Sequence, residues 1–140
     1  MSGPIPAKRR LRLVVLNDSQ PVVKMLCDWF TKHGHHCDAA LLSDMPRAHE
    51  EVWRFVSAHR PDVVVYDVGM PYEGSWDLLE AIRMSPALQS QSFVITTPNK
   101  AKLEQAVGRT DALEISGRAR DLRRLLKAVD EATDVARQTG

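Results

Sequence analysis

An uninterrupted apolar run extends from Val63 to Tyr66, with Asp67 directly after it. A run without polar alternation predicts a strand buried on both faces, which is typical of a parallel sheet covered by helices. Gly69 and the pair Met70 and Pro71 then indicate a loop. Asp67 therefore lies at the carboxyl end of a strand, where such sheets bind ligands. Taken alone, it fits a turn-starting residue equally well.

The rest of the chain repeats this construction. Further strands are predicted at residues 11–16, 37–42, 93–97 and 112–116, and helices at 20–33, from Ser43 or Asp44 to His59, around 76–84, at 99–107 and up to about Ala136. Trp76 is expected to pack at the start of its helix. Five strands alternating with five helices predict an α/β fold with a doubly wound parallel sheet.

A single domain is expected, because the chain has 140 residues and no internal repeat. We assign residues 11–137 to this domain and residues 1–10 to a flexible basic tail, and we expect no output domain. The net charge of +1 predicts no general attraction to nucleic acid or anionic membranes. The basic face of Arg120, Arg123, Arg124 and Lys127 is read as a solvated helix face.

No stretch is long and apolar enough to predict a membrane span, and the start of the chain does not resemble a signal peptide. A cytoplasmic location is therefore expected. Cys27 and Cys37 fit no disulfide framework, so we expect two buried thiols. His35 and His36 are assigned to opposite sides of a strand rather than to a metal site.

Polar side chains follow several of the predicted strands. Asn17 and Asp18 follow the first strand, Asp67 the third and Thr97 the fourth, and a basic residue comes after the fifth. Right-handed crossovers place the carboxyl ends of parallel strands along one edge of the sheet. Carboxylates and a carbonyl-rich loop suit Mg²⁺, and a hydroxyl with a cation suits a phosphoryl group.

Four segments, LVVLNDSQPVVKML, PDVVVYDVGMPYEGSWDLLEAIR, FVITTPN and LEISGRARDLRRLLKAV, together resemble the receiver domain of bacterial two-component response regulators. The resemblance covers residues 11 to about 135 and implies a flavodoxin-like fold with strand order 2-1-3-4-5. It also implies that a sensor histidine kinase or a phosphotransfer protein donates a phosphoryl group to the chain.

The resemblance assigns a role to each polar residue of the edge. Asp67 falls at the phosphoacceptor position, and Asp18 at the position of a direct Mg²⁺ ligand. Asn17 replaces the second acid and would reach the metal through water, while Gly69 supplies a main-chain carbonyl ligand. Thr97 matches the residue whose hydroxyl contacts the phosphoryl group.

Three further positions depart from the family pattern. Arg118 stands where the family has Lys, and Ala119 where it has Pro. Because a cis bond before a residue other than proline costs about 3 kcal/mol, the Arg118–Ala119 bond is expected to be trans. Ile115 replaces the aromatic switch residue. We expect Arg118 to be a poor substitute for Lys at a tight site, and Ile115 to weaken the coupling of phosphorylation to the protein surface, while Asn17 weakens metal binding.

The resulting hypothesis is a stand-alone receiver that is phosphorylated on Asp67 with Mg²⁺. It would signal through a downstream protein partner, with homodimer formation and self-dephosphorylation left open, and would not be an enzyme in its own right. One alternative is a pseudo-receiver that binds proteins without phosphorylation. The other is a flavodoxin-like ligand binder or enzyme, although residues 17–20 form no glycine-rich phosphate loop.

Overall fold

The computed structural model describes residues 10–45 and 48–139, so most of the predicted tail, residues 1–9, lies outside the described residues. In chain order the elements are β1 Arg12–Asn17, α1 Gln20–Lys32, β2 His36–Leu41, the 3₁₀ helix η1 Leu42–Asp44, α2 Ala48–His59, β3 Val63–Asp67, α3 Tyr72–Arg83, the 3₁₀ helix η2 Pro86–Leu88, β4 Ser92–Thr97, α4 Lys100–Val107, β5 Leu113–Glu114 and α5 Ala119–Thr139. The predicted alternation of strands and helices is confirmed.

The sheet is parallel throughout, with strand order β2-β1-β3-β4-β5, which confirms the predicted order. All five residues of β3 are buried, as the apolar run predicted. β1 pairs with β2 over six residue pairs, whereas β4 pairs with β5 only at Thr96 and Thr97. The outer strand thus pairs along its whole length at the β2 edge of the sheet, but only over two residues of its neighbour at the β5 edge.

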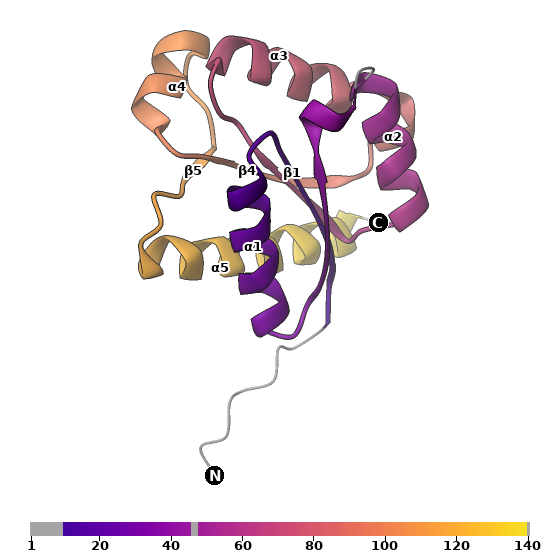
Figure 1. The fold of residues 1–140 in the computed structure, drawn as a ribbon. Helices are drawn as coiled ribbons and strands as arrows, with labels where there is room; N and C mark the ends of the chain where they lie inside the picture. Colours follow the sequence, from indigo (N-terminus) through magenta and orange to yellow (C-terminus); the bar gives the residue numbers. More distant parts are fainter. Residues whose placement is uncertain (1–9, 46–47, 140) are drawn as a thin grey trace.

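Helices cover both faces of the sheet, with α2, α3 and α4 on one face and α1 and α5 on the other (Figure 1). Alternation along the strands divides the core accordingly. Val64 and Tyr66 of β3 belong to the cluster beneath α2, α3 and α4, and Val63 and Val65 to the cluster beneath α1 and α5. This alternation explains why β3 needs apolar residues at every position.

Polar caps start the two helices that follow β1 and β4. Ser19 caps α1 by accepting a hydrogen bond from the Val22 N–H, and Asn99 caps α4 by accepting one from the Lys102 N–H. Each cap satisfies an N–H group that the first turn of a helix leaves unpaired. The caps thus fix the point at which the chain leaves each strand.

Several predicted helix boundaries are wrong, and α3 begins at Tyr72 rather than near Trp76. The helix expected from Ser43 or Asp44 begins only at Ala48, after the 3₁₀ turn η1. Met45, which ends that turn, has φ −117° and ψ 86°. It precedes a proline in the sequence, and a following proline disfavours helical dihedrals. The last helix continues to Thr139, beyond the predicted end near Ala136.

The fifth strand is shorter than predicted, because only Leu113 and Glu114 of residues 112–116 form it. Local side chains bind the backbone on either side. Before the strand, the Thr110 N–H donates to Glu104 Oε2 at 2.8 Å. After it, the N–H and the hydroxyl of Ser116 both donate to Asp121 Oδ2, at 3.1 and 3.0 Å. Such local hydrogen bonds compete with pairing along a sheet.

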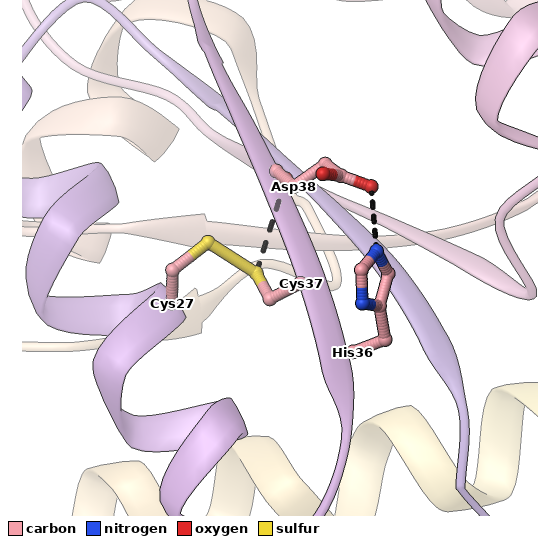
Figure 2. Close-up of a disulfide and its surroundings, with 4 residues drawn as sticks. All are labelled: Cys27, His36, Cys37 and Asp38. Carbon is pink, nitrogen blue, oxygen red and sulfur yellow. Dashed lines mark hydrogen bonds and ion pairs between the residues drawn. A yellow bond between two sulfur atoms is a disulfide. The ribbon is translucent and has the colours of Figure 1, made fainter.

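The prediction of two free thiols is also wrong, because Cys27 of α1 and Cys37 of β2 form a disulfide (Figure 2). Their Cα atoms lie 5.4 Å apart, within the range that a disulfide bridges. The packing of α1 beside β2 brings the two residues together, and their separation of 10 residues in the sequence does not reveal this contact.

His35 and His36 do point to different surroundings, as expected. His35 is buried and its Nδ1 accepts a hydrogen bond from the Leu11 N–H at 3.1 Å, while His36 is exposed and its Nε2 lies 3.1 Å from Asp38 Oδ2 (Figure 2). Among the residues that the structure describes, no helix has both the length and the apolar character needed to cross a bilayer.

Candidate functional site

The carboxyl ends of β1, β3 and β4 bring three polar side chains into contact. Asn17 ends β1, Asp67 ends β3, and Thr96 is the next-to-last residue of β4. The register of β3 and β4 places Asp67 directly beside Thr96 on the neighbouring strand. All three residues are buried, with relative exposures of 5% for Asn17, 7% for Asp67 and 0% for Thr96. This is the edge at which the sequence predicted a site.

Both carboxylate oxygens of Asp67 accept hydrogen bonds. The Thr96 hydroxyl donates to Oδ1 at 2.6 Å, and the amide nitrogen of Asn17 donates to Oδ2 at 2.7 Å. The same amide nitrogen also donates to the main-chain carbonyl of Asp67 at 2.9 Å. The carboxylate is therefore held in one orientation by its two neighbouring strands.

The orientation of the Asn17 amide follows from its partners. Its oxygen accepts a hydrogen bond from the Ser19 N–H at 2.6 Å, while its nitrogen faces two oxygens of Asp67. A flipped amide would set oxygen against oxygen and N–H against N–H. Asn17 thus presents a donor to Asp67, where an acid would present a second negative charge.

Burial raises the pKa of the Asp67 carboxyl above its ordinary value, and the hydrogen bond from Thr96 opposes this rise. Burial also raises the pKa of the neighbouring Tyr66 to about 12, with smaller contributions from the charges of Asp18 and Asp67. An ionised Asp67 is therefore costly unless a cation or further donors come close to it.

The predicted phosphoryl contact, Thr97, is buried, but its hydroxyl donates to the main-chain carbonyl of Val68 at 2.8 Å. Thr96, which sequence reasoning missed, provides the hydroxyl next to Asp67. Successive strand residues point to opposite faces, so one step in register decides which of two neighbouring threonines meets the carboxylate. The role of Thr97 stays a prediction.

The remaining predicted metal ligands lie around this contact. Asp18 follows Asn17 and is exposed to solvent. Gly69 lies beside Asn17, because a Cβ placed on it would be 4.0 Å from the Asn17 amide nitrogen. In the described part of the chain, no group of three or more His, Cys, Asp or Glu residues converges.

The oxygens of this edge still suit a hard cation. The carboxylates of Asp18 and Asp67 and the carbonyl of Gly69 are the type of donor that Mg²⁺ binds, with water filling the other positions. The Asn17 amide oxygen, which accepts a hydrogen bond from the Ser19 N–H, is neutral and adds no negative charge to this set. The donor set therefore fits a Mg²⁺ ion held by fewer charges than a pair of acids would provide.

Arg118 does not reach the carboxylate in this structure. Its side chain is exposed and, within residues 10–45 and 48–139, forms no ion pair, while its main-chain carbonyl accepts hydrogen bonds from the N–H groups of Asp121 and Leu122. The Arg118–Ala119 bond is trans, as predicted, and the cis bond of the described residues is Met70–Pro71. Ile115 packs against the core cluster beneath α1 and α5.

No family model matches the sequence, and no curated protein matches it. Solved structures do match. The chemotaxis response regulator CheY4 of Vibrio cholerae is 22% identical with a TM-score of 0.61, and the match covers 86% of this chain and 99% of that chain. A sensor protein from Polaromonas sp. JS666 is 15% identical with a TM-score of 0.71, over 91% and 99% of the two chains.

A third structure, a CheY-like response regulator receiver domain from Methylobacillus flagellatus, is 16% identical with a TM-score of 0.62, over 86% of this chain and 99% of its own. Identities at this level establish similarity of fold. Strand order, helix placement and these matches agree. The chain has the five-stranded, flavodoxin-like fold of response regulator receiver domains.

Proposed function

We propose that the chain is a signalling receiver that accepts a phosphoryl group on Asp67 in a reaction that needs Mg²⁺. The observation that carries this proposal is a buried carboxylate at the carboxyl end of the central strand, fixed by Thr96 and Asn17 on either side. Fold alone does not establish a function, whereas a buried and oriented carboxylate provides the nucleophile that this reaction needs.

The chemistry requires a positioned nucleophile. An oxygen of Asp67 attacks the phosphorus of a phosphohistidine, a P–O bond forms, and the P–N bond breaks so that the imidazole nitrogen keeps the electron pair. Each carboxylate oxygen accepts one hydrogen bond in the structure and retains a further lone pair for this attack. The product is an aspartyl phosphate.

A bound Mg²⁺ ion would neutralise the charge that collects on the phosphoryl oxygens. Asp18, Asp67 and the Gly69 carbonyl are the residues proposed to hold it. Arg118 would supply a second cation only if it moves from its exposed position toward Asp67. We further propose that a histidine kinase or phosphotransfer protein is the donor, that output passes through a protein partner, and that these reactions occur in the cytoplasm.

The test is the intact mass of the protein after incubation with acetyl phosphate, with and without Mg²⁺. We expect one phosphoryl group per chain that depends on Mg²⁺ and is absent from Asp67→Ala. Asp77→Ala is the matched control, because Asp77 is an exposed acid on α3, and it should be phosphorylated normally. A persistent adduct on Asp67→Ala would reject Asp67 as the acceptor.

Two further pairs of variants test the details. Thr96→Ala should slow phosphorylation more than Thr97→Ala, because the Thr96 hydroxyl is the one in contact with the Asp67 carboxylate. Combining Arg118→Lys with Ala119→Pro should raise phosphorylation if Arg118 fails to reach the site. An unchanged level in that double variant would reject this explanation of a weak reaction.

A pseudo-receiver that does not take phosphate is the second candidate. The donor that Asn17 presents to Asp67 favours it, because this hydrogen bond satisfies one carboxylate oxygen without a metal. Complete absence of an adduct from folded protein at high Mg²⁺ would select this candidate. Asn17→Asp then becomes informative, since restoring the second acid should restore Mg²⁺ binding and phosphorylation.

A further inference from the structure

The edge of the sheet beside β4 is incomplete. β5 pairs only with Thr96 and Thr97, so among the described residues Ser92 to Ile95 have β3 on one side and no strand on the other. The Val68 N–H donates to the Thr96 carbonyl and the Ile115 N–H to the Thr97 carbonyl. The backbone of Thr96 therefore faces the β3 side, and that of Thr97 faces β5. Because successive residues of a strand face opposite sides, the backbone N–H groups of Phe93 and Ile95 and the carbonyl of Phe93 face the open side.

A groove of about 860 Å³ follows this open edge. Trp76 and Arg83 of α3 line one side, Ala128 and Ala132 of α5 line the other, and Phe93 of β4 lies between them. Figure 1 shows α3 and α5 on opposite sides of β4. The groove thus occupies the place that a longer fifth strand would fill.

The segment before β5 borders the groove through residues 109–111 but does not pair with β4 as a strand, because two of its N–H groups are bonded to side chains. The Thr110 N–H is bonded to Glu104 Oε2 at 2.8 Å, and the Ala112 N–H to the Thr110 hydroxyl at 3.3 Å. These bonds hold the chain beside the end of α4. Unpaired backbone groups on a sheet edge are satisfied best by another extended chain.

We propose that the groove binds an extended peptide segment of a partner protein as an added strand beside β4. In such binding the main chain provides hydrogen bonds and alternate side chains enter pockets. A second copy of this chain fits less well. Its own β4 edge also lies between α3 and α5, so the walls of the two grooves would meet before the strands could pair.

The lining indicates which peptides fit. Ala128 and Ala132 leave room on the α5 side, so branched aliphatic residues at alternate peptide positions should point there. The charged residues of the lining are Arg83, Arg109, Asp111 and Glu131, two of each sign. The net charge of the groove therefore contributes little to the choice of peptide. The apolar side chains of the peptide and its unbroken row of backbone N–H groups should contribute most.

The experiment titrates ¹⁵N-labelled protein with the blocked peptide acetyl-Lys-Val-Thr-Val-Thr-Val-Lys-amide, and separately with a version that has proline in place of the central valine. We expect shifts and slowed hydrogen exchange at the amides of Phe93 and Ile95 with the first peptide only. Proline removes a backbone donor and should abolish the effect. Shifts elsewhere, or equal shifts with both peptides, overturn the proposal.

A blocking variant provides the second measurement. Ala128→Trp fills the groove from the α5 side without removing a native side-chain hydrogen bond, and should eliminate peptide binding. Ala106→Trp, on the exposed surface of α4, is the matched control and should bind normally. Circular dichroism establishes that both variants are folded, and acetyl phosphate labelling of Asp67 is measured alongside.

Three outcomes would reject the peptide as the occupant. The first is no shift at millimolar peptide, and the second is undiminished binding by folded Ala128→Trp. The third is a shift of the Phe93 amide that depends on protein concentration without peptide, because a second copy then fills the groove. The result is independent of the proposed phosphorylation, since Asp67 is not among the residues that line the groove.

Discussion

The two sides of the sheet differ in how completely the outer strand covers its inner neighbour. β2 runs beside β1 over six residue pairs and is tied to α1 by the disulfide of Cys27 and Cys37. β5 covers β4 over two pairs and leaves an open groove. Both outer strands belong to the same parallel sheet, so the difference comes from the segments that flank them.

Those flanking segments differ. The first residue of β2 already belongs to the ladder, since the His36 N–H donates to the Leu11 carbonyl, one residue before β1, at 2.9 Å. Near β5, by contrast, the N–H groups of Thr110 and Ser116 bond to the side chains of Glu104 and Asp121 instead of to β4. A strand therefore ends where local side chains satisfy its backbone better than the neighbouring strand does. Four measurements test this comparison, in order of decreasing expected effect.

Hydrogen exchange should show the largest difference. The amides of Leu13 and Val15 face β2 and should be protected up to the free energy of global unfolding, whereas the amide of Phe93 faces the open edge. We expect Phe93 to exchange faster by roughly a thousandfold or more. Exchange measured residue by residue by NMR provides the comparison. Equal protection would mean that β4 is covered in solution.

Removing the disulfide should have the next largest effect. Reduction, or the double variant Cys27→Ser and Cys37→Ser, should lower the free energy of unfolding by about 2 to 3 kcal/mol, because the bond closes a loop of 10 residues in the unfolded chain. Denaturant unfolding measures this loss. A reductant should not affect the double variant, and native protein should not react with a maleimide before reduction. A labelled native protein would show that the thiols are free.

Replacing Asp67, on the central strand, should change the free energy of unfolding without changing the strand pairing at either edge of the sheet. Burial raises the pKa of Asp67 in the folded state above its value in the unfolded chain. The protonated carboxyl therefore stabilises the fold at low pH, and this stabilisation is lost as the pH rises from the ordinary pKa through the raised one. Asp67→Asn should therefore be more stable than the parent near neutral pH, by about 1 kcal/mol. The difference should disappear in acid.

Unfolding curves across the pH range measure this change. The exposed acid Asp77 provides the control, and Asp77→Asn should match the parent within about 0.5 kcal/mol. The gain from Asp67→Asn should be equal with and without the disulfide, because distant sites act independently. A pH-independent gain, or a loss, would contradict the raised pKa.

The smallest effect concerns the contact between the helices that lie beside the two edges. The indole N–H of Trp29 on α1 donates to the Leu122 carbonyl on α5 at 3.2 Å. Trp29→Phe removes this bond and should lower the free energy of unfolding by about 1 kcal/mol. Trp53→Phe, at an exposed position on α2, should change it by less than about 0.5 kcal/mol. Equal losses would reject the contact.

Much of the site was predictable from the sequence, and the part that was not depended on register. The position of Asp67 after a buried run predicted a carboxylate at the sheet edge, and Asn17 was placed beside it. Thr96 and Thr97 are adjacent, and only the pairing of β4 with β3 shows which hydroxyl reaches Asp67. The sequence signal for Thr96 was a second hydroxyl residue at the same strand end.

The order of strands and helices and the burial of β3 on both faces follow from the amino-acid sequence, because apolar runs and helical spacing are local and periodic signals. The disulfide, the exposed position of Arg118 and the short fifth strand depend instead on the packing of the folded chain. Each of these depends on which distant groups come within bonding distance. Spacing along the chain does not specify those distances, since packing of helices against the sheet sets them.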